Sequence, residues 1–232
     1  MKIKNIKINS VLIILIILFG FFVRFNGYTR AEPASYHPDD YLLTEKVLDM
    51  AGAYDLTNTK HLGWPGATLF NFYGLFYKIL SICGFKVYYN LVLHTLQLNS
   101  IILGTLSILI LYLIVRRTYS EKAALFAAAL FSVMADPAVM SHWATTDVTL
   151  IFFMLCCFYF IVKIAQNKPE ELFSLKENKL KFNKNYMFVS LFLTLAIATK
   201  WTGVTLIAAV LIAILLSYNV FDIIKEKKIK KS

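Results

Sequence analysis

The stretch YHPDDY at residues 36–41 separates the first apolar run of the chain, residues 11–23, from a long series of further apolar runs. Its two adjacent carboxylates, Asp39 and Asp40, directly follow a histidine and a proline. A charged group this close to a membrane span is costly to place, so such groups usually have a function. We therefore expect both acids to lie just outside a bilayer and to face a cavity formed by the surrounding membrane helices.

The composition is that of a polytopic membrane protein. Of the 232 residues, 58% are hydrophobic and only 16% are charged, and the mean hydropathy is +0.62, whereas a soluble domain is about half apolar and a quarter charged. The net charge of +10 would also suit nucleic acid, but the basic residues stand in blocks between apolar runs, as in cytoplasmic loops. We expect the lipid bilayer as a partner and no nucleic acid. Three cysteines lack metal-site spacing and are predicted to be buried packing residues: Cys83, Cys156 and Cys157.

The apolar runs predict an all-α membrane bundle of about six spans. The positive-inside rule then places the N-terminus, the pair Arg116-Arg117, a loop at about residues 166–185 and a basic tail at residues 222–232 in the cytoplasm. We expect a single membrane module over the whole chain, multi-pass in the cell membrane, with both termini cytoplasmic. The expected spans are residues 11–23, 88–115, 123–135, 148–162, 186–199 and 204–218.

The first external loop, at about residues 26–87, is predicted to hold two amphipathic juxtamembrane helices. Pro38 suits the first turn of a helix, the helix dipole favours the two aspartates that follow it, and apolar residues then recur at helical spacing as far as Gly52. Residues 67–85 are apolar and aromatic but include Asn71 and Lys78. These polar residues favour an interfacial or re-entrant helix over a full span.

Three polar features fall on the predicted outer side, namely the acids at the start of the first loop, residues 141–147, and Lys200. Asp39 and Asp40 could be a solvated helix N-terminus or could supply a general base, because a partly desolvated carboxylate gains basicity and can take a proton from a hydroxyl group. The second acid could orient the first or hold a cation. His37, beside them, is a candidate for binding substrate.

The other two features also have two interpretations each. In the stretch SHWATTD at residues 141–147, a threonine could cap the following helix with Asp147 in its first turn, or Asp147 and His142 could bind a polar head group. Lys200 could be an interfacial lysine, or it could offset the charge of a departing phosphate. A base, a second acid and a cation at one membrane rim suit group transfer from a lipid-anchored phosphate, and the sequence has no Gly-rich phosphate loop.

At these residues the sequence resembles the GT-C superfamily of polyprenyl-phosphate-dependent glycosyltransferases, and within it the protein O-mannosyltransferase and aminoarabinose-transferase branch. HPDD at residues 37–40 resembles the acidic motif of the first external loop, and WPG at residues 64–66 resembles the next landmark. SHWATTD at residues 141–147 is similar to the Ser-x-x-Ala-x-x-Asp stretch that opens a later span. ATKWTG at residues 198–203 resembles the Thr-Lys-aromatic/Gly turn. Each motif is short, but their order and spacing extend along nearly the whole chain.

The resemblance implies an inverting transfer from a dolichyl- or undecaprenyl-phosphate sugar to a glycan, lipid or protein acceptor. By motif position, Asp39 is the catalytic base and Asp40 its partner, Asp147 helps to bind donor or acceptor, and Lys200 contacts the lipid phosphate. Some relatives use a divalent cation, for which Asp39 and Asp40 are the candidate ligands in this sequence.

Members of that superfamily usually run considerably longer, with more spans and often a soluble C-terminal domain. The chain could therefore be a truncated product, one half of a split enzyme that needs a second membrane subunit, or a remnant. The competing interpretation is a non-catalytic membrane subunit or remnant that binds lipid or a partner protein. A transporter or channel is disfavoured, because the charges lie mainly at the ends of the expected spans.

Overall fold

The computed structural model describes a bundle of α-helices with one short β-hairpin. The helices pack together, which confirms the predicted all-α membrane bundle, and the hairpin lies in a loop between two of them. The described residues are 2–29, 37–52, 67–166, 173–176, 179–182 and 184–217. The elements are α1 (Lys2–Phe25), α2 (Pro38–Gly52), α3 (Ala67–Ile82), α4 (Tyr89–Thr118), α5 (Glu121–Val133), α6 (Ala135–Met140), α7 (Thr146–Gln166), β1 (Phe173–Lys176), β2 (Lys179–Phe182), α8 (Lys184–Thr199), the 3-10 helix η2 (Trp201–Thr205) and α9 (Leu206–Ser217).

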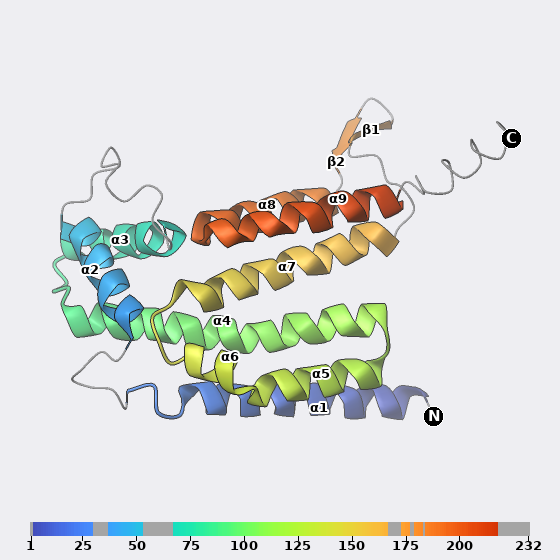
Figure 1. Cartoon of the computed structure of the whole chain (residues 1–232), viewed down its shortest axis with the longest axis horizontal. Helices are drawn as coiled ribbons and strands as arrows, with labels where there is room; N and C mark the ends of the chain where they lie inside the picture. The colour runs from blue at the N-terminus through green and yellow to red at the C-terminus, as the bar shows by residue number, and fades with distance from the viewer. Residues whose placement is uncertain are drawn as a thin grey trace, which may run out of the picture.

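The longer helices run back and forth along the long axis of the molecule (Figure 1). The start of α1, the end of α4 with Arg116 and Arg117, the β-hairpin and the end of α9 lie at one end, which we call the hairpin end. Helices α2 and α3 lie at the other, which we call the α2–α3 end. The described basic segments that were predicted to share one side of the membrane lie together at the hairpin end.

Three helices are long and apolar enough to cross a membrane, at Ile8–Phe25, Tyr89–Thr118 and Thr146–Gln166. Helix α8 and the segment Trp201–Leu216 are apolar but shorter. Helix α5 has 13 residues, which at about 1.5 Å per residue give about 20 Å against a hydrocarbon core of about 30 Å. The expected span at residues 123–135 is therefore a short helix that ends at Val133, and the chain continues into α6.

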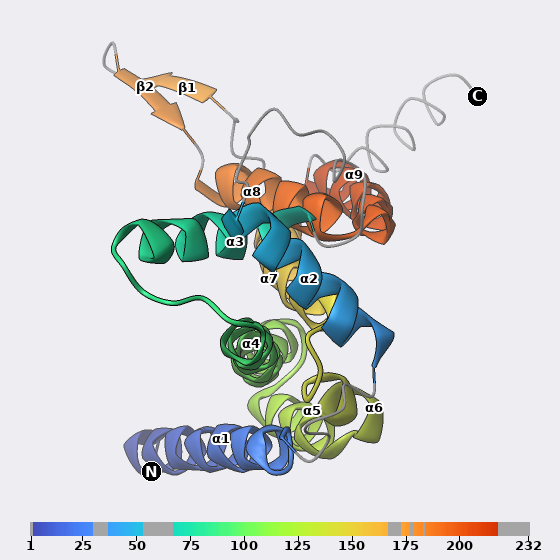
Figure 2. The same cartoon turned by 90° about the vertical axis from the view of Figure 1, so that its left-hand side faces the viewer.

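Viewed along the long axis, α4 and α7 lie between two outer pairs, α1 with α5 and α8 with α9 (Figure 2). One core joins α1, α4 and α5 around the fully buried Ile108 and Ala128, and a second joins α7, α8 and α9 around Cys157 and Ala196. Small residues such as these alanines let helix backbones approach closely, which favours helix association in a membrane. Large apolar side chains on the outer faces, such as Phe22, are exposed as lipid contact requires.

At the α2–α3 end, the apolar face of α2 packs against α3 and the first turns of α4. Val47, Tyr77 and Val92 are buried together there. The Tyr77 hydroxyl donates to the Leu91 carbonyl at 3.2 Å, and burial raises the pKa of this phenol, so it stays protonated. Helix α3 ends at Ile82, and Gly84, two residues further on, has a φ of 87° that suits glycine and turns the chain toward α4.

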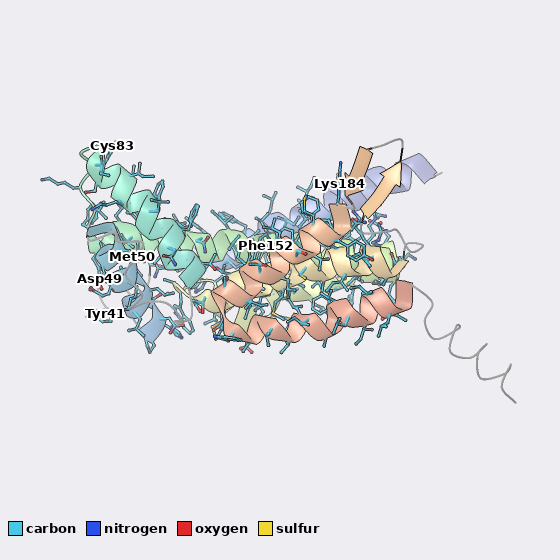
Figure 3. All side chains as sticks on the ribbon, turned by 90° about the horizontal axis from the view of Figure 1, so that it is seen from above. Tyr41, Asp49, Met50, Cys83, Phe152 and Lys184 are labelled. Carbon is cyan, nitrogen blue, oxygen red and sulfur yellow. The ribbon has the colours of Figure 1, made fainter. Side chains whose placement is uncertain are left out.

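The structure departs from the sequence interpretation in two further places. Within the expected cytoplasmic loop, β1 and β2 pair antiparallel with Phe173 opposite Phe182, because apolar and polar residues alternate there with the period of a strand. Cys83 is exposed, since it lies just beyond the last turn of α3 (Figure 3), whereas Cys156 and Cys157 are buried as predicted. The WPG motif and the basic tail at 222–232 lie outside the described residues.

Candidate functional site

The two acids of the HPDD motif occupy the first turn of α2 and have different surroundings. Asp39 has 38% of its side chain exposed, and its backbone N–H donates to Nδ1 of His37 at 3.2 Å. Asp40 is only 1% exposed. The local sequence accounts for the start of the helix, since Pro38 fixes φ and both carboxylates lie at the positive end of the helix dipole. It does not account for the burial of Asp40.

Asp40 is buried because it binds the segment before α7. The Ala144 backbone N–H donates to Oδ1 of Asp40 at 2.5 Å, across 104 residues of sequence. Ala144 is itself buried, beside α2 and α4. A buried carboxylate with a backbone donor of this kind makes a charge-assisted hydrogen bond, one of the stronger contacts available to a protein. The structure thus brings the first and second motifs together.

Aromatic and histidine contacts reinforce the same junction. The imidazole of His37 stacks on the indole of Trp143, with ring centroids 4.3 Å apart. Nε2 of His142 lies 3.4 Å from the carbonyl oxygen of Val23 in α1. Both histidines named in the sequence analysis therefore lie at the α2–α3 end, one against the 141–147 segment and one against α1.

The third motif joins this group through Asp147. The Asp147 backbone N–H donates to Oγ1 of Thr145 at 3.2 Å, so of the two threonines that could cap α7, Thr145 does so. Nζ of Lys200 lies 2.6 Å from Oδ1 of Asp147, and both side chains are about one-third exposed. Gly203 holds this turn close to α8, because a Cβ there would lie 2.6 Å from the Ala196 carbonyl carbon.

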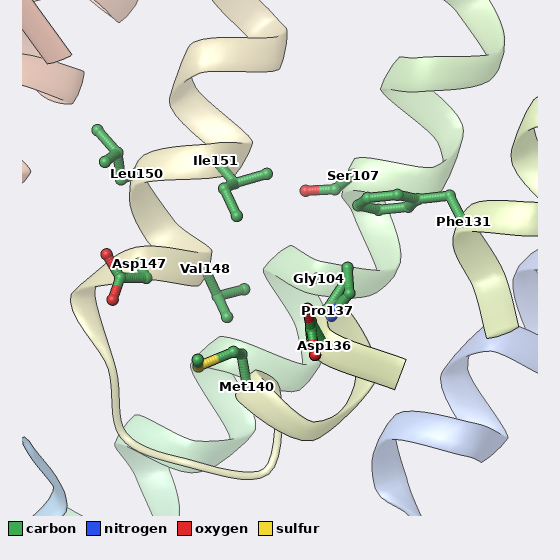
Figure 4. Close-up of a pocket in the computed structure, with 10 residues that line it drawn as sticks. All are labelled: Gly104, Ser107, Phe131, Asp136, Pro137, Met140, Asp147, Val148, Leu150 and Ile151. Atoms are coloured by element: carbon green, nitrogen blue, oxygen red, sulfur yellow. The ribbon is translucent and has the colours of Figure 1, made fainter. Parts of the chain in front are cut away.

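An apolar cavity of about 300 Å³ lies beside Asp147, between α4, α6 and α7 (Figure 4). Its walls include Ser107, Phe131, Met140 and Ile151. Asp136, in the first turn of α6, also lines it and is exposed. A cavity was expected beside Asp39 and Asp40, not here, and Asp136 was not predicted as part of a site, because this cavity depends on how α6 folds back toward α7.

The described residues contain no group of three or more His, Cys, Asp or Glu side chains that could hold a metal ion. Asp39 and Asp40, the predicted candidate ligands for a cation, lack a third such side chain beside them in the described part of the chain, and Oδ1 of Asp40 accepts from the Ala144 N–H.

Fold and site together define a helical membrane protein with two carboxylates and a carboxylate–ammonium pair gathered at one end of its bundle. The model of the dolichyl-phosphate-mannose-protein mannosyltransferase family matches residues 83–231, more than half of the chain. The chain belongs to this family, which is one of membrane glycosyltransferases. The match includes the 141–147 segment and Lys200 and begins after Asp39 and Asp40.

The chain is also similar to dolichyl-phosphate-mannose–protein mannosyltransferase 5 of Saccharomyces cerevisiae. The two are 30% identical over 107 residues, which make up 46% of this chain and 13% of the yeast protein. The chain thus spans a small part of the length of that relative. No solved structure matches the chain.

Proposed function

We propose that the chain is a membrane glycosyltransferase, or part of one, that transfers a sugar from a polyprenyl-phosphate donor to a hydroxyl or amine acceptor. One observation carries the proposal. The contacts of Asp40 with Ala144 and of Asp147 with Lys200 join the acids of α2 to a cation through a single short segment. Family membership supports the class of donor, because the family's description names a dolichyl-phosphate sugar.

Asp39 is the base of the proposed reaction, and Asp40 is its buried partner. Asp39 is partly exposed, so an acceptor can reach it, whereas Asp40 is engaged by Ala144. Asp39 takes the proton of the acceptor hydroxyl or amine while the acceptor atom attacks the anomeric carbon. The bond from that carbon to the phosphate oxygen breaks, and its electron pair leaves with the phosphate. A single displacement from the opposite face inverts the configuration.

Lys200 serves the leaving group in this scheme. Its ammonium has three N–H donors, and within the described part of the chain only Asp147 accepts from it. The remaining donors are free to meet phosphate oxygens, and a fixed ammonium there offsets the charge that develops as the bond breaks. Asp147 holds the ammonium in place, and His37 and His142 contact substrate groups at the same end.

The same proposal assigns the membrane orientation. The hairpin end carries Arg116, Arg117 and Lys184, and basic residues favour the cytoplasmic side. The α2–α3 end then lies on the extracytoplasmic side with the acids, where a sugar donor and a glycan, lipid or protein acceptor meet.

A second candidate function is a non-catalytic membrane subunit or remnant that binds lipid or a partner protein. The similarity to the yeast mannosyltransferase is limited to 107 residues, 13% of that protein, so it does not by itself carry that protein's activity over to this chain. A subunit of this kind would bind a polyprenyl-phosphate without turnover and would co-purify with a second membrane protein.

Binding of a polyprenyl-phosphate to the purified chain in lipid nanodiscs tests the proposal. We expect saturable binding that weakens about tenfold in Lys200→Ala, the loss of about one charge-assisted contact, and also weakens in Asp147→Ala. Lys184→Ala, an exposed lysine at the hairpin end, is the matched control and should bind as the wild type does. Equal binding by all variants would remove Lys200 from the donor site. Sugar transfer that is lost in Asp39→Asn then separates the enzyme from the binding subunit.

A further inference from the structure

Arg24, in the last turn of α1, is fully buried. A guanidinium stays charged in proteins, and a buried charge is costly unless its donors are satisfied. Within the described part of the chain, no carboxylate forms an ion pair with it. A cation in this position needs another source of stabilisation, which Nη1 and Nη2 find in backbone carbonyls, whereas Nε has no hydrogen-bond partner in the described part of the chain.

The guanidinium of Arg24 binds the end of a neighbouring helix. Nη1 donates to the carbonyl oxygens of Gly20 and Ser132, and Nη2 donates to that of Phe131, all at 3.1 Å. Phe131 and Ser132 lie in the last turn of α5, where carbonyls lack partners within the helix and the dipole is negative. Arg24 therefore caps α5 from α1.

The capped end of α5 leads directly into the segment that holds Asp40. The helical path breaks at Met134 (φ −58°, ψ 128°), α6 follows, and the Ser141 hydroxyl then donates to the Pro137 carbonyl at 2.7 Å. Ser141 and Arg24 meet at the same point on α4, since a Cβ on Gly104 would lie 2.5 Å from Oγ of Ser141 and 3.2 Å from Nε of Arg24.

A second contact joins α1 to the 141–144 segment. Nε2 of His142 lies 3.4 Å from the carbonyl oxygen of Val23, the residue before Arg24. Two residues beyond His142, the Ala144 N–H binds Asp40. Arg24 is thus linked to the buried acid of α2 in two ways: along the chain from the capped end of α5 through α6, and through its shared position with Ser141 at Gly104.

We propose that Arg24 is a positioning residue for Asp40: its guanidinium fixes the end of α5 against α1 and thereby places residues 141–144, whose Ala144 N–H holds the Asp40 carboxylate. The importance of this placement for sugar transfer rests on the function proposed above, whereas the placement itself does not. Methionine at this position fills similar volume but cannot bind the carbonyls. Lysine keeps the charge with fewer fixed donors.

Hydrogen–deuterium exchange of the full chain in nanodiscs, without donor or acceptor, tests the placement directly. In Arg24→Met we expect exchange to rise about tenfold in the peptide covering residues 141–146, as local opening becomes easier, while α4 and α7 keep their protection. Asp40→Ala, which removes the acceptor of the Ala144 N–H, is the positive control for that peptide, and Arg24→Lys should fall between Arg24→Met and the wild type. Arg117→Met, an exposed arginine at the hairpin end, should change neither region.

Increased exchange confined to α1 and α5 would overturn the proposal, because it would show that Arg24 only packs those helices. An unchanged peptide 141–146 in Arg24→Met would overturn it as well. If Arg24→Met does not fold, Arg24→Lys decides by the same comparison. No activity enters this measurement, so a failure of sugar transfer and a failure of the placement give different results.

Discussion

Nζ of Lys200 lies 2.6 Å from Oδ1 of Asp147, so an ion pair joins the end of α8 to the start of α7 across 53 residues of sequence. Both side chains are about one-third exposed. Exposed pairs of this kind contribute about 0–1 kcal/mol to stability. The contact is therefore better suited to holding an ammonium in position than to stabilising the fold.

The ion pair should contribute little to stability. We expect Lys200→Met and Asp147→Asn each to lower the free energy of unfolding by less than about 1 kcal/mol, with a coupling of the same size in the double variant. Denaturant unfolding of the purified chain in detergent measures all four states of this cycle. A coupling of several kcal/mol would mean that the pair is structural and that its proposed role toward phosphate is secondary.

Substitutions of the two acids of α2 should have different effects, one mainly on stability and the other on activity. Asp40→Ala leaves the buried Ala144 N–H without an acceptor, which costs about 1–3 kcal/mol, whereas Asp40→Asn keeps a carbonyl oxygen there and should cost less. Asp39→Asn should leave the unfolding midpoint unchanged, because Asp39 is partly exposed, and should abolish sugar transfer. Equal destabilisation by Asp39→Asn and Asp40→Ala would contradict this division of roles.

Two helix caps offer a matched comparison. Ser120 caps α5 at the hairpin end, accepting from the Ala123 N–H, and Thr145 caps α7 beside the site. Each replacement by alanine should lower stability by about 0.5–2 kcal/mol. Only Thr145→Ala should also weaken binding of a polyprenyl-phosphate, because it loosens the turn that carries Asp147. Thermal unfolding and lipid binding should be measured on both variants. If Ser120→Ala weakened binding as much as Thr145→Ala, the proposed location of the site would be wrong.

Local sequence signals predicted the parts of the site that depend on neighbouring residues. Pro38 before two aspartates marks the start of α2, and a threonine before Asp147 marks the cap of α7. The burial of Asp40 and of Arg24 was not predictable in this way. Each depends on a backbone group more than 100 residues away, at Ala144 and at Ser132. Their partners follow from how α5 ends and α6 begins, which no periodic pattern in the sequence records.

Gly203 should tolerate no side chain. A Cβ there would meet backbone atoms of Ala196 and Ile197 at 2.6–2.8 Å, and backbone cannot move aside as a side chain can. Gly203→Ala should therefore displace η2 and Lys200, lowering stability by about 1–3 kcal/mol, as overpacking does. Gly52→Ala is the control, because nothing lies within 4 Å of a Cβ at that helical position. Its stability should be unchanged or slightly higher, and a similar loss in both variants would contradict the contact.

The orientation of the bundle can be read from one native thiol and one introduced thiol. Cys83 is exposed at the α2–α3 end (Figure 3). Cys156 and Cys157 are buried in α7 and should not react. A membrane-impermeant maleimide should label Cys83 on intact cells, because that end lies outside in the proposed orientation. In a Cys83→Ser background, Lys184→Cys places a thiol at an exposed position of the hairpin end. This thiol should react only after permeabilisation. The opposite pattern would place the acids, Asp147 and Lys200 in the cytoplasm and would contradict transfer on the extracytoplasmic side.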